Sequence, residues 1–377
     1  MRARELGIVV GRGTPGPNNA ITDVAGVRVG HTTLVRGAGP LVVGTGPVRT
    51  GITVIEPREG SVWTEPAFAG CHRLNGNGEL TGLEWIRESG LLTSPIALTN
   101  THSVGIVRDA LVAAEIRASA PGRPNWSLPV VGETWDGLLN DVDGMHVRPE
   151  DVAAALEAAR GGPVAEGNVG GGTGMVCHEF KGGIGTSSRL LPVAGGGFTV
   201  GVLVQANYGV RERLTVWGVP VGQEIPLEEV PAPEPPEGPG GGRAPAPGSG
   251  SIIAIVATDA PLLPHQCERL AQRVGLGIAR MGGVGGHSSG DLFLAFATGN
   301  RGLRVEEGDG ILTLPLAMLS DERITPLYEA VVDATEEAIL NALLAAETMT
   351  GRDGVTAHAL PRDRLLEVLR AYRRLDG

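Results

Sequence analysis

Aromatic residues are scarce in this 377-residue chain, at 3% of the composition, so its core must be built from Val, Leu, Ile and Ala. Cysteine is scarce too. The three cysteines, Cys71, Cys177 and Cys267, are odd in number and widely spaced, which argues against a disulfide scaffold. No apolar run reaches transmembrane length, and the first residues lack the apolar stretch of a signal peptide. We therefore expect a cytoplasmic protein.

An excess of positive charge is also missing. The formal net charge is −11, and nucleic-acid binding needs a basic surface, so no nucleic-acid partner is expected. Cys71-His72 and Cys177-His178 lack the paired short-range ligands of a zinc site, so no metal is expected. The Gly-rich stretches lack the GK[ST] of a phosphate loop and the spacing of a dinucleotide site. These absences predict an enzyme without a cofactor, or a protein that only binds.

Glycine, with 59 residues, and apolar residues, with 42% of the chain, are plentiful. The glycines cluster in loops between apolar runs, which indicates tight turns between strands and helices. The pattern predicts strands at 51–56, 95–98 and 199–205, and helices at 82–89, 104–118 and 150–160. Mixed elements of this kind indicate sheets covered by helices, in an α/β or α+β architecture.

Residues 231–250, rich in Pro and Gly, predict a flexible linker. A continuous apolar run at 251–258 follows and is typical of a strand buried on both faces. Beyond it, the pattern predicts a helix at 264–280, a Gly-rich turn at 281–290, a strand at 292–298 and a long helix at 325–348.

The junction between this linker and the buried strand is Gly250–Ser251. A serine held at a strand start, after a glycine that permits unusual dihedrals, is placed to attack the preceding carbonyl and form an ester. Hydrolysis of that ester leaves a free α-amine, whose ordinary pKa of about 7.7–8.0 suits a base near neutral pH. The alternative is a plain linker with a chance Gly-Ser. Ser249 is a rival cleavage site, disfavoured because it lies two residues back in the linker.

Several blocks of the chain resemble one family nearly end to end. They are residues 15–34, LNGNGELTG at 74–82, GNVGGGTGMVCHEFKGGIGTSSR at 167–189, VGVLVQANYG at 200–209, HSSGDLFLAF at 287–296 and ILNALLAAETMTGRDG at 339–354. Together they resemble the L-aminopeptidase/D-esterase family of self-processing N-terminal serine hydrolases, which includes β-aminopeptidases. The resemblance implies an α+β fold, a layered αββα sandwich of the N-terminal-nucleophile hydrolase type. It also implies a long chain, 1–250, and a short chain, 251–377, that stay together as one structural domain, and a homotetramer of such pairs.

The resemblance assigns the nucleophile to Ser251 and an oxyanion-hole amide to Asn207. An Asn amide is a donor able to stabilise a developing oxyanion, although an Asn at a strand end is more often a turn residue. Ser289 and Asp291 match a Ser-x-acid pair. Alternate strand positions point the same way, so both are expected to face Ser251 and to orient its amine and hydroxyl. Without the resemblance, SSGD is an ordinary turn sequence.

Glu133 matches the family acid that receives the substrate's N-terminal ammonium; the alternative is a surface or capping Glu. Two residues on, some members have a catalytic Tyr where this chain has Trp135. An indole has no hydroxyl and is larger, so we expect a narrower site and a weaker oxyanion contact there.

The sequence therefore predicts a self-cleaving serine aminopeptidase, amidase or esterase that acts on short peptides, amino-acid amides or esters through a Ser251 acyl-enzyme. One alternative is an acyltransferase of similar architecture, in which an amine instead of water takes the acyl group. Another is an uncleaved, non-catalytic binding protein. The mass of the purified chain separates the last alternative from the first two.

Overall fold

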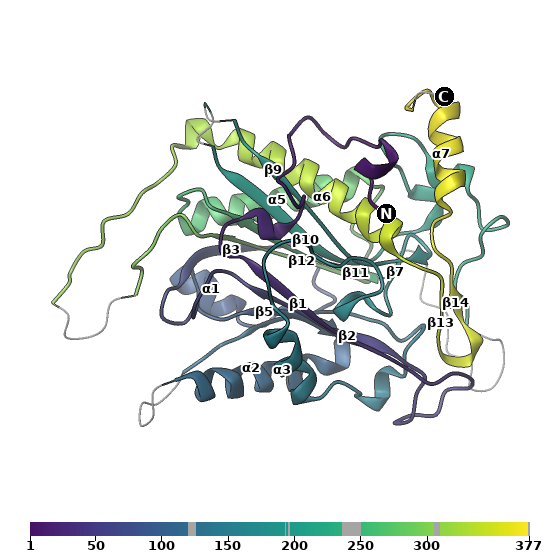
Figure 1. The fold of residues 1–377 in the computed structure, drawn as a ribbon, viewed down its shortest axis with the longest axis horizontal. Coiled ribbons are helices and arrows are strands. Elements are labelled where there is room, and N and C mark those ends of the chain that lie inside the picture. Colours follow the sequence, from purple (N-terminus) through teal and green to yellow (C-terminus); the bar gives the residue numbers. More distant parts are fainter. Residues whose placement is uncertain (120–125, 193, 195–196, 236–249, 305–309, 376–377) are drawn as a thin grey trace.

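A computed structural model of the chain describes residues 1–119, 126–192, 194, 197–235, 250–304 and 310–375, and shows four layers, with two sheets between two layers of helices (Figure 1). The six-stranded sheet has the order β4 (Leu91–Leu92), β3 (Ala67–Arg73), β12 (Ser289–Ala297), β11 (Gly250–Thr258), β10 (Thr199–Asn207) and β9 (Gly183–Leu190). The four-stranded sheet has the order β1 (Arg28–Arg36), β2 (Val48–Glu56), β5 (Ile96–Asn100) and β6 (Val130–Thr134). Two short hairpins pair β7 (Val176–Cys177) with β8 (Phe180–Lys181), and β13 (Met349–Thr350) with β14 (Thr356–Ala357).

The helices cover the outer face of each sheet. Helices α5 (Pro264–Arg280) and α6 (Thr325–Ala345) pack on the six-stranded sheet, and α2 (Val104–Ala118) and α3 (Pro149–Glu157) pack on the four-stranded sheet (Figure 1). The remaining helices are α1 (Leu83–Ser89), α4 (Val221–Glu224) and α7 (Arg362–Ala371). Most strand neighbours are antiparallel, so the expected α+β sandwich is confirmed.

Strand β11 lies inside the six-stranded sheet and is buried on both faces. Alternate residues separate two cores: Ile252 and Ala254 pack beneath the helices, whereas Ile253 and Ile255 pack against the other sheet. All four side chains are fully buried. The continuous apolar run that follows the linker therefore forms the predicted strand, because only a strand covered on both faces places every residue out of water.

Most predicted elements are confirmed, with corrections at their ends. The helices predicted at 104–118 and 264–280 have the same bounds in the structure. The long helix ends at Ala345, three residues early, and α7 was not expected. The predicted turn at 281–290 is wrong in its last two residues, because β12 already begins at Ser289. Of the predicted linker, residues 236–249 lie outside the described residues.

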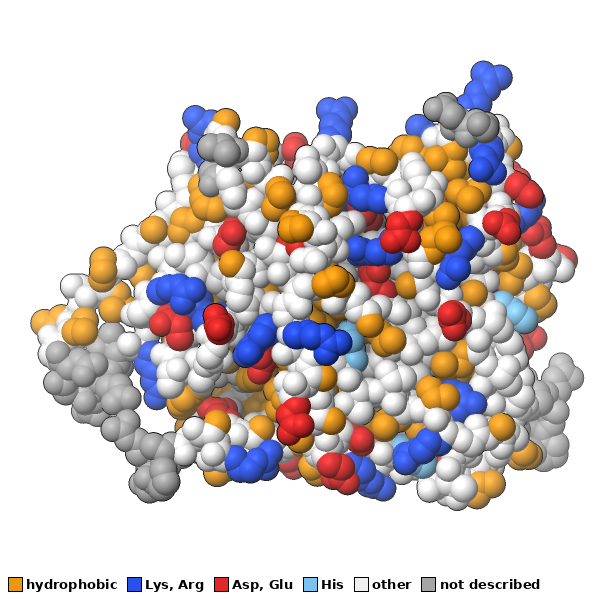
Figure 2. All heavy atoms as spheres, viewed as in Figure 1, with side chains coloured by type: hydrophobic (Ala, Val, Ile, Leu, Met, Phe, Trp, Pro, Cys, Tyr) orange, Lys and Arg blue, Asp and Glu red, His pale blue; other side chains and the backbone are white. Residues whose placement is uncertain are grey.

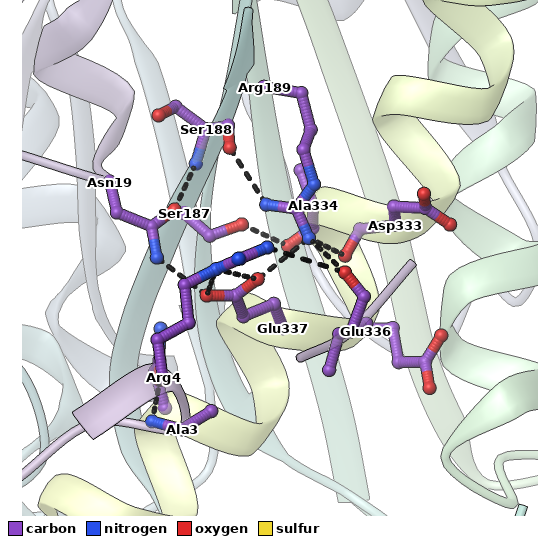
Figure 3. A network of polar contacts seen from close by, with 12 residues as sticks. Ala3, Arg4, Asn19, Ser187, Ser188, Arg189, Asp333, Ala334, Glu336 and Glu337 are labelled. Carbon is purple, nitrogen blue, oxygen red and sulfur yellow. Dashed lines mark hydrogen bonds and ion pairs between the residues drawn. The ribbon is translucent and has the colours of Figure 1, made fainter. Parts of the chain in front are cut away.

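A buried polar network joins the N-terminal segment to β9 and α6, far from the predicted junction in sequence (Figure 3). Glu337 on α6 lies at its centre: it accepts from Arg189 of β9 at 2.7 Å and from Arg4 at 3.0 Å. The side chain of Glu337 is fully buried, so its charge depends on these partners.

Among the described residues, no helix is long and apolar enough to cross a membrane.

Candidate active site

Strand register brings three residues together at the start of β11. The antiparallel pairing of β10 with β11 places Asn207 opposite Ser251, and the parallel pairing of β11 with β12 places Gly290 opposite Ser251 on the other side. The backbone N–H of Gly290 donates to Ser251 Oγ at 3.0 Å. Ser251 is buried, with 6% of its surface exposed, and its side chain is therefore held in one position by the neighbouring strand.

Gly250, the residue before Ser251, is already part of β11 and has a φ of +138°. This backbone conformation is one that residues with a side chain rarely adopt. A β-carbon at Gly250 would also lie 2.2 Å from the carbonyl oxygen of Asn207. The Gly250–Ser251 peptide thus sits in a position that only glycine permits, directly against the strand that carries Asn207.

The amide of Asn207 is fixed at both ends. Its Oδ1 accepts from the N–H of Val176 at 2.8 Å, and its Nδ2 donates to the carbonyl oxygen of Trp135 at 3.0 Å. These contacts account for one of the two hydrogens on Nδ2, and the second has no protein acceptor among the described residues. Asn207 is the last residue of β10 and is buried, so it is a strand residue and not a turn residue.

Ser289 and Asp291 form a hydrogen-bonded pair, with Ser289 Oγ donating to Asp291 Oδ1 at 2.6 Å. The expectation that both point the same way is confirmed. The expectation that both face the Ser251 hydroxyl is wrong, because Gly290 is the residue in register with Ser251. Its two neighbours in β12 therefore point to the opposite, helix-covered face, the face of Phe293.

The pair lies instead beside the backbone of β11. The N–H of Ile252, the residue after Ser251, lies close enough to the Asp291 carboxylate to lower its pKa. Burial raises the pKa of Asp291 above its usual range, and the hydrogen bonds from Ser289 and Asn75, with the nearby N–H of Ile252, offset part of that rise. The pair thus lies beside the β11 backbone, next to the residue that follows Ser251.

Glu133 is the fourth residue of β6 and is almost completely buried, with 3% of its surface exposed. Its Oε1 accepts from the N–H of Glu79 at 2.9 Å, and its Oε2 accepts from Thr101 Oγ1. A β-carbon added to Gly78 would lie 3.0 Å from Glu133 Oε1 and 3.2 Å from the α-carbon of Gly290. The carboxylate therefore lies near Ser251, and the alternative of a surface Glu is wrong. Burial raises its pKa, and the two hydrogen bonds offset part of that rise.

Trp135 follows β6 and contacts the site through its backbone. Its carbonyl oxygen is the acceptor for Asn207, a contact that does not depend on the side chain. The indole is 39% exposed and lies over Gly137, where a β-carbon would come within 2.4 Å of it. The contact that supports Asn207 is therefore the same whether residue 135 is Tyr or Trp.

A cavity of about 640 Å³ opens beside the Ser289–Asp291 pair. Tyr208 and Ile278 form part of its floor, and the Gly-rich segment 282–286 forms one rim. Its charged lining residues are Glu179, Arg211, Glu212, Arg213, Glu228 and Asp291. Acids outnumber arginines by four to two in this lining, a balance that favours a cationic or neutral ligand.

Comparison with known proteins assigns this arrangement to a family, because the model of peptidase family S58 matches residues 19–357. The chain belongs to peptidase family S58. It is 48% identical over 375 residues to the beta-peptidyl aminopeptidase BapA of Sphingosinicella microcystinivorans, covering 99% of this chain and 93% of that protein.

Solved structures of aminopeptidases share the fold. A beta-aminopeptidase of Burkholderia sp. superposes with a TM-score of 0.89 at 56% identity, covering 98% of this chain and 99% of that one. The L-aminopeptidase D-Ala-esterase/amidase of Ochrobactrum anthropi, described as a serine aminopeptidase and a variant of the Ntn hydrolase fold, gives 0.87 at 43% identity, covering 100% and 99%. The chain is thus a serine aminopeptidase of S58 with an Ntn-type fold.

Several residues of the candidate site were not predicted from the sequence. The N–H of Gly290 contacts Ser251, the N–H of Val176 holds Asn207, and Thr101 contacts Glu133. Two of these contacts come from backbone groups, which leave no signal in residue type. Asn75 lies in LNGNGELTG, a block that carried the family resemblance but to which no chemical role was assigned.

Proposed function

We propose that the chain cleaves its own Gly250–Ser251 bond and that the freed Ser251 is the nucleophile of an aminopeptidase that also hydrolyses amides and esters. The observation that carries this proposal is the geometry of the junction. A glycine with a φ of +138° precedes a serine whose Oγ is held at 3.0 Å from a backbone N–H, opposite the Asn207 amide. The nucleophile, the bond to be cut and the oxyanion donor thereby share one end of the sheet.

Cleavage follows as an acyl shift. Ser251 Oγ attacks the carbonyl carbon of Gly250, and the negative charge on the carbonyl oxygen is stabilised by the second hydrogen of Asn207 Nδ2. The C–N bond then breaks, the nitrogen keeps the proton released from Oγ, and an ester links Gly250 to Ser251. Water hydrolyses the ester, which leaves the Gly250 carboxylate, the hydroxyl and a free α-amine.

Ser251, its α-amine and the Ser289–Asp291 pair then catalyse hydrolysis of the substrate. The amine takes the proton of Oγ as Oγ attacks a substrate carbonyl, and returns it to the leaving amine. The Ser289–Asp291 pair, beside the β11 backbone, orients this amine. Water then releases the acyl group. An amine in place of water would make the enzyme an acyltransferase, and product partition with an added amine separates the two.

One acidic residue supports a substrate with a free amino group. Glu133 lies near Ser251 and suits the N-terminal ammonium, which would replace one of its present donors. Short peptides, amino-acid amides and esters are the substrates that this arrangement fits.

We further propose that the cleaved chains, 1–250 and 251–377, stay together and assemble as a homotetramer. Strand β11 begins at Gly250 and pairs along its whole length with β10 and β12, so the short chain is held inside the sheet whether or not the bond is cut. An exposed apolar segment, residues 310–319, supports assembly between copies.

Denaturing mass analysis with N-terminal sequencing tests the cleavage. The wild-type protein should separate into residues 1–250 and 251–377, with the second piece beginning Ser-Ile-Ile, and Ser251→Ala should stay whole and inactive. A folded wild-type chain that remains intact, or a second piece that begins at Ser249, would show the assignment to be wrong.

A further inference from the structure

The segment LNGNGE, residues 74–79, continues from β3 along the first residues of β12 and reaches the Ser289–Asp291 pair. The side chain of Asn75 makes two contacts there: Nδ2 donates to Asp291 Oδ2 at 3.0 Å and to the carbonyl oxygen of Gly286 at 3.0 Å. The backbone of Asn75 is fixed as well, because its carbonyl oxygen accepts from the N–H of Asp291 at 3.2 Å. Both the side chain and the backbone of Asn75 are therefore held by hydrogen bonds.

The chemistry of the partners fixes the orientation of the Asn75 amide. A carbonyl oxygen only accepts hydrogen bonds, and an ionised carboxylate only accepts them too, so Nδ2 and not Oδ1 must face both. The two hydrogens of Nδ2 suffice for the two acceptors. Asn75 thereby ties the Asp291 carboxylate to Gly286, in the Gly-rich rim of the cavity.

The Asp291 carboxylate depends on such donors for its charge. Ser289 Oγ and Asn75 Nδ2 donate to it, and the nearby N–H of Ile252 also lowers its pKa. Among the described residues, no Arg, Lys or His forms an ion pair with it. The charge of Asp291 acts on Tyr208, the residue after β10. The other titratable residues that line the same cavity are Glu179, Arg211, Glu212, Arg213 and Glu228, and α5 contributes the uncharged Ile278.

We propose that Asn75 is a positioning residue for catalysis, which orients the Asp291 carboxylate toward Ser289 and toward the α-amine of Ser251. The inference rests on the proposed function, because the amine exists only after cleavage. Asn75 touches neither substrate nor nucleophile, and it acts through Asp291 alone.

Loss of the Asn75 donor changes the titration of the site in a definite direction. A carboxylate with one hydrogen-bond donor fewer holds a proton more tightly, whether the proton is its own or that of the neighbouring ammonium. Both groups must be deprotonated for the amine to act as a base. The acidic limb of kcat/KM against pH, which reports the free enzyme, therefore moves to higher pH.

The test compares two neighbouring asparagines. Asn77 is a matched control, because its Nδ2 donates to the carbonyl oxygen of Ser288 at 2.7 Å, in the same turn but not to the carboxylate. The cleaved enzyme is assayed on one small amino-acid amide across pH. Asn75→Ala should move the acidic midpoint up by about one pH unit, the effect of one charge-assisted hydrogen bond, with KM nearly constant at the plateau. Asn75→Asp, which adds a like charge, should move it further, and Asn77→Ala should keep the wild-type midpoint.

The outcomes separate this role from a structural one. If both Asn75 variants lower the plateau and leave the midpoint unchanged, or if Asn77→Ala shifts the midpoint as much, Asn75 only supports the loop and the inference is wrong. Asn75→Asp keeps the size and shape of the side chain, so it carries the test if Asn75→Ala does not fold. Cleavage or turnover retained in Ser251→Ala would instead refute the proposed function, independently of the Asn75 results.

Discussion

Gly250 and Gly290 shape the candidate site without contributing a side chain. Gly250 permits the positive φ at the junction, and a β-carbon at Gly290 would lie 2.4 Å from the carbonyl oxygen of Asn77. The N–H of Gly290, which is in register with Ser251, donates to Ser251 Oγ. The nucleophile is therefore positioned by backbone that only glycine allows, and the chemical side chains are arranged around it.

Asn207 gives a prediction at this scale. Asn207→Ala should lower kcat by about a hundred- to a thousand-fold, the usual effect of losing one oxyanion-hole donor, and should change KM much less. Asn207→Asp keeps an acceptor for the Val176 N–H but removes the donor, so it should lose at least as much. Steady-state kinetics on one small amino-acid amide provide the measurement. Near-full turnover in Asn207→Ala would mean that Asn207 only holds the backbone of Val176 and Trp135.

The side chains of the site were predictable only in part. Ser251, Asn207 and Glu133 were assigned from the family resemblance, and the structure places all three near the start of β11. The alternation of Ser289 and Asp291 was also predictable, since strand geometry has a period of two. Their face was not, because it depends on the register between β11 and β12, which no local pattern specifies.

At the scale of elements, helices with a regular pattern were predicted best. Helix α5, at Pro264–Arg280, begins at a proline in its first turn and has one apolar face, so local signals define it. Strand β12 was predicted three residues short, because Ser-Ser-Gly has the composition of a turn. Pairing with β11 and with residues 74–77 extends the strand through that sequence, which is a tertiary effect that overrides local preference.

The network around Glu337 gives a prediction about how elements are held together. Glu337→Gln would leave the guanidinium of Arg189, which is 1% exposed, without its buried counter-charge (Figure 3). Breaking one side of a buried ion pair usually costs about 3–5 kcal/mol, so the free energy of unfolding should fall by that amount. Chemical denaturation at neutral pH is the measurement. Arg364→Gln, which removes a partly exposed ion pair with Glu229, is the control. It should change the free energy of unfolding by about 1 kcal/mol or less. Equal midpoints for wild type and Glu337→Gln would mean that the network contributes no net stability.

At the scale of the whole molecule, charge is dispersed and one apolar segment projects from the body. Acidic and basic side chains are interspersed on the face shown in Figure 2. The segment 310–319, which contains no charged residue, belongs to the long arm at the left of Figure 1. Its base is anchored by Asn300, whose side chain exchanges hydrogen bonds with the backbone of Ala317 at 2.9 and 3.0 Å. Toward the tip, Leu312 is 96% exposed.

This arm leads to a prediction about assembly. Residues 311–316 make no hydrogen bond to other described residues, and Ile311, Leu312 and Leu316 are exposed, so the arm offers apolar side chains to a second copy. In the proposed homotetramer the arm would be covered. Light scattering coupled to gel filtration should give about four times the 38.9 kDa chain for the wild type.

The arm variant makes that prediction specific. Leu312→Asp should give a smaller assembly, because burying an unpaired carboxylate in an apolar contact is unfavourable. Ile116→Asp, at an exposed apolar position on α2, is the control and should keep the wild-type mass. The cleavage pattern should be the same in both variants, since the junction lies within one chain's sheet. A wild-type protein that elutes as a single copy would refute the tetramer. An unchanged assembly in Leu312→Asp would leave the tetramer standing and show that the arm does not form the contact between copies.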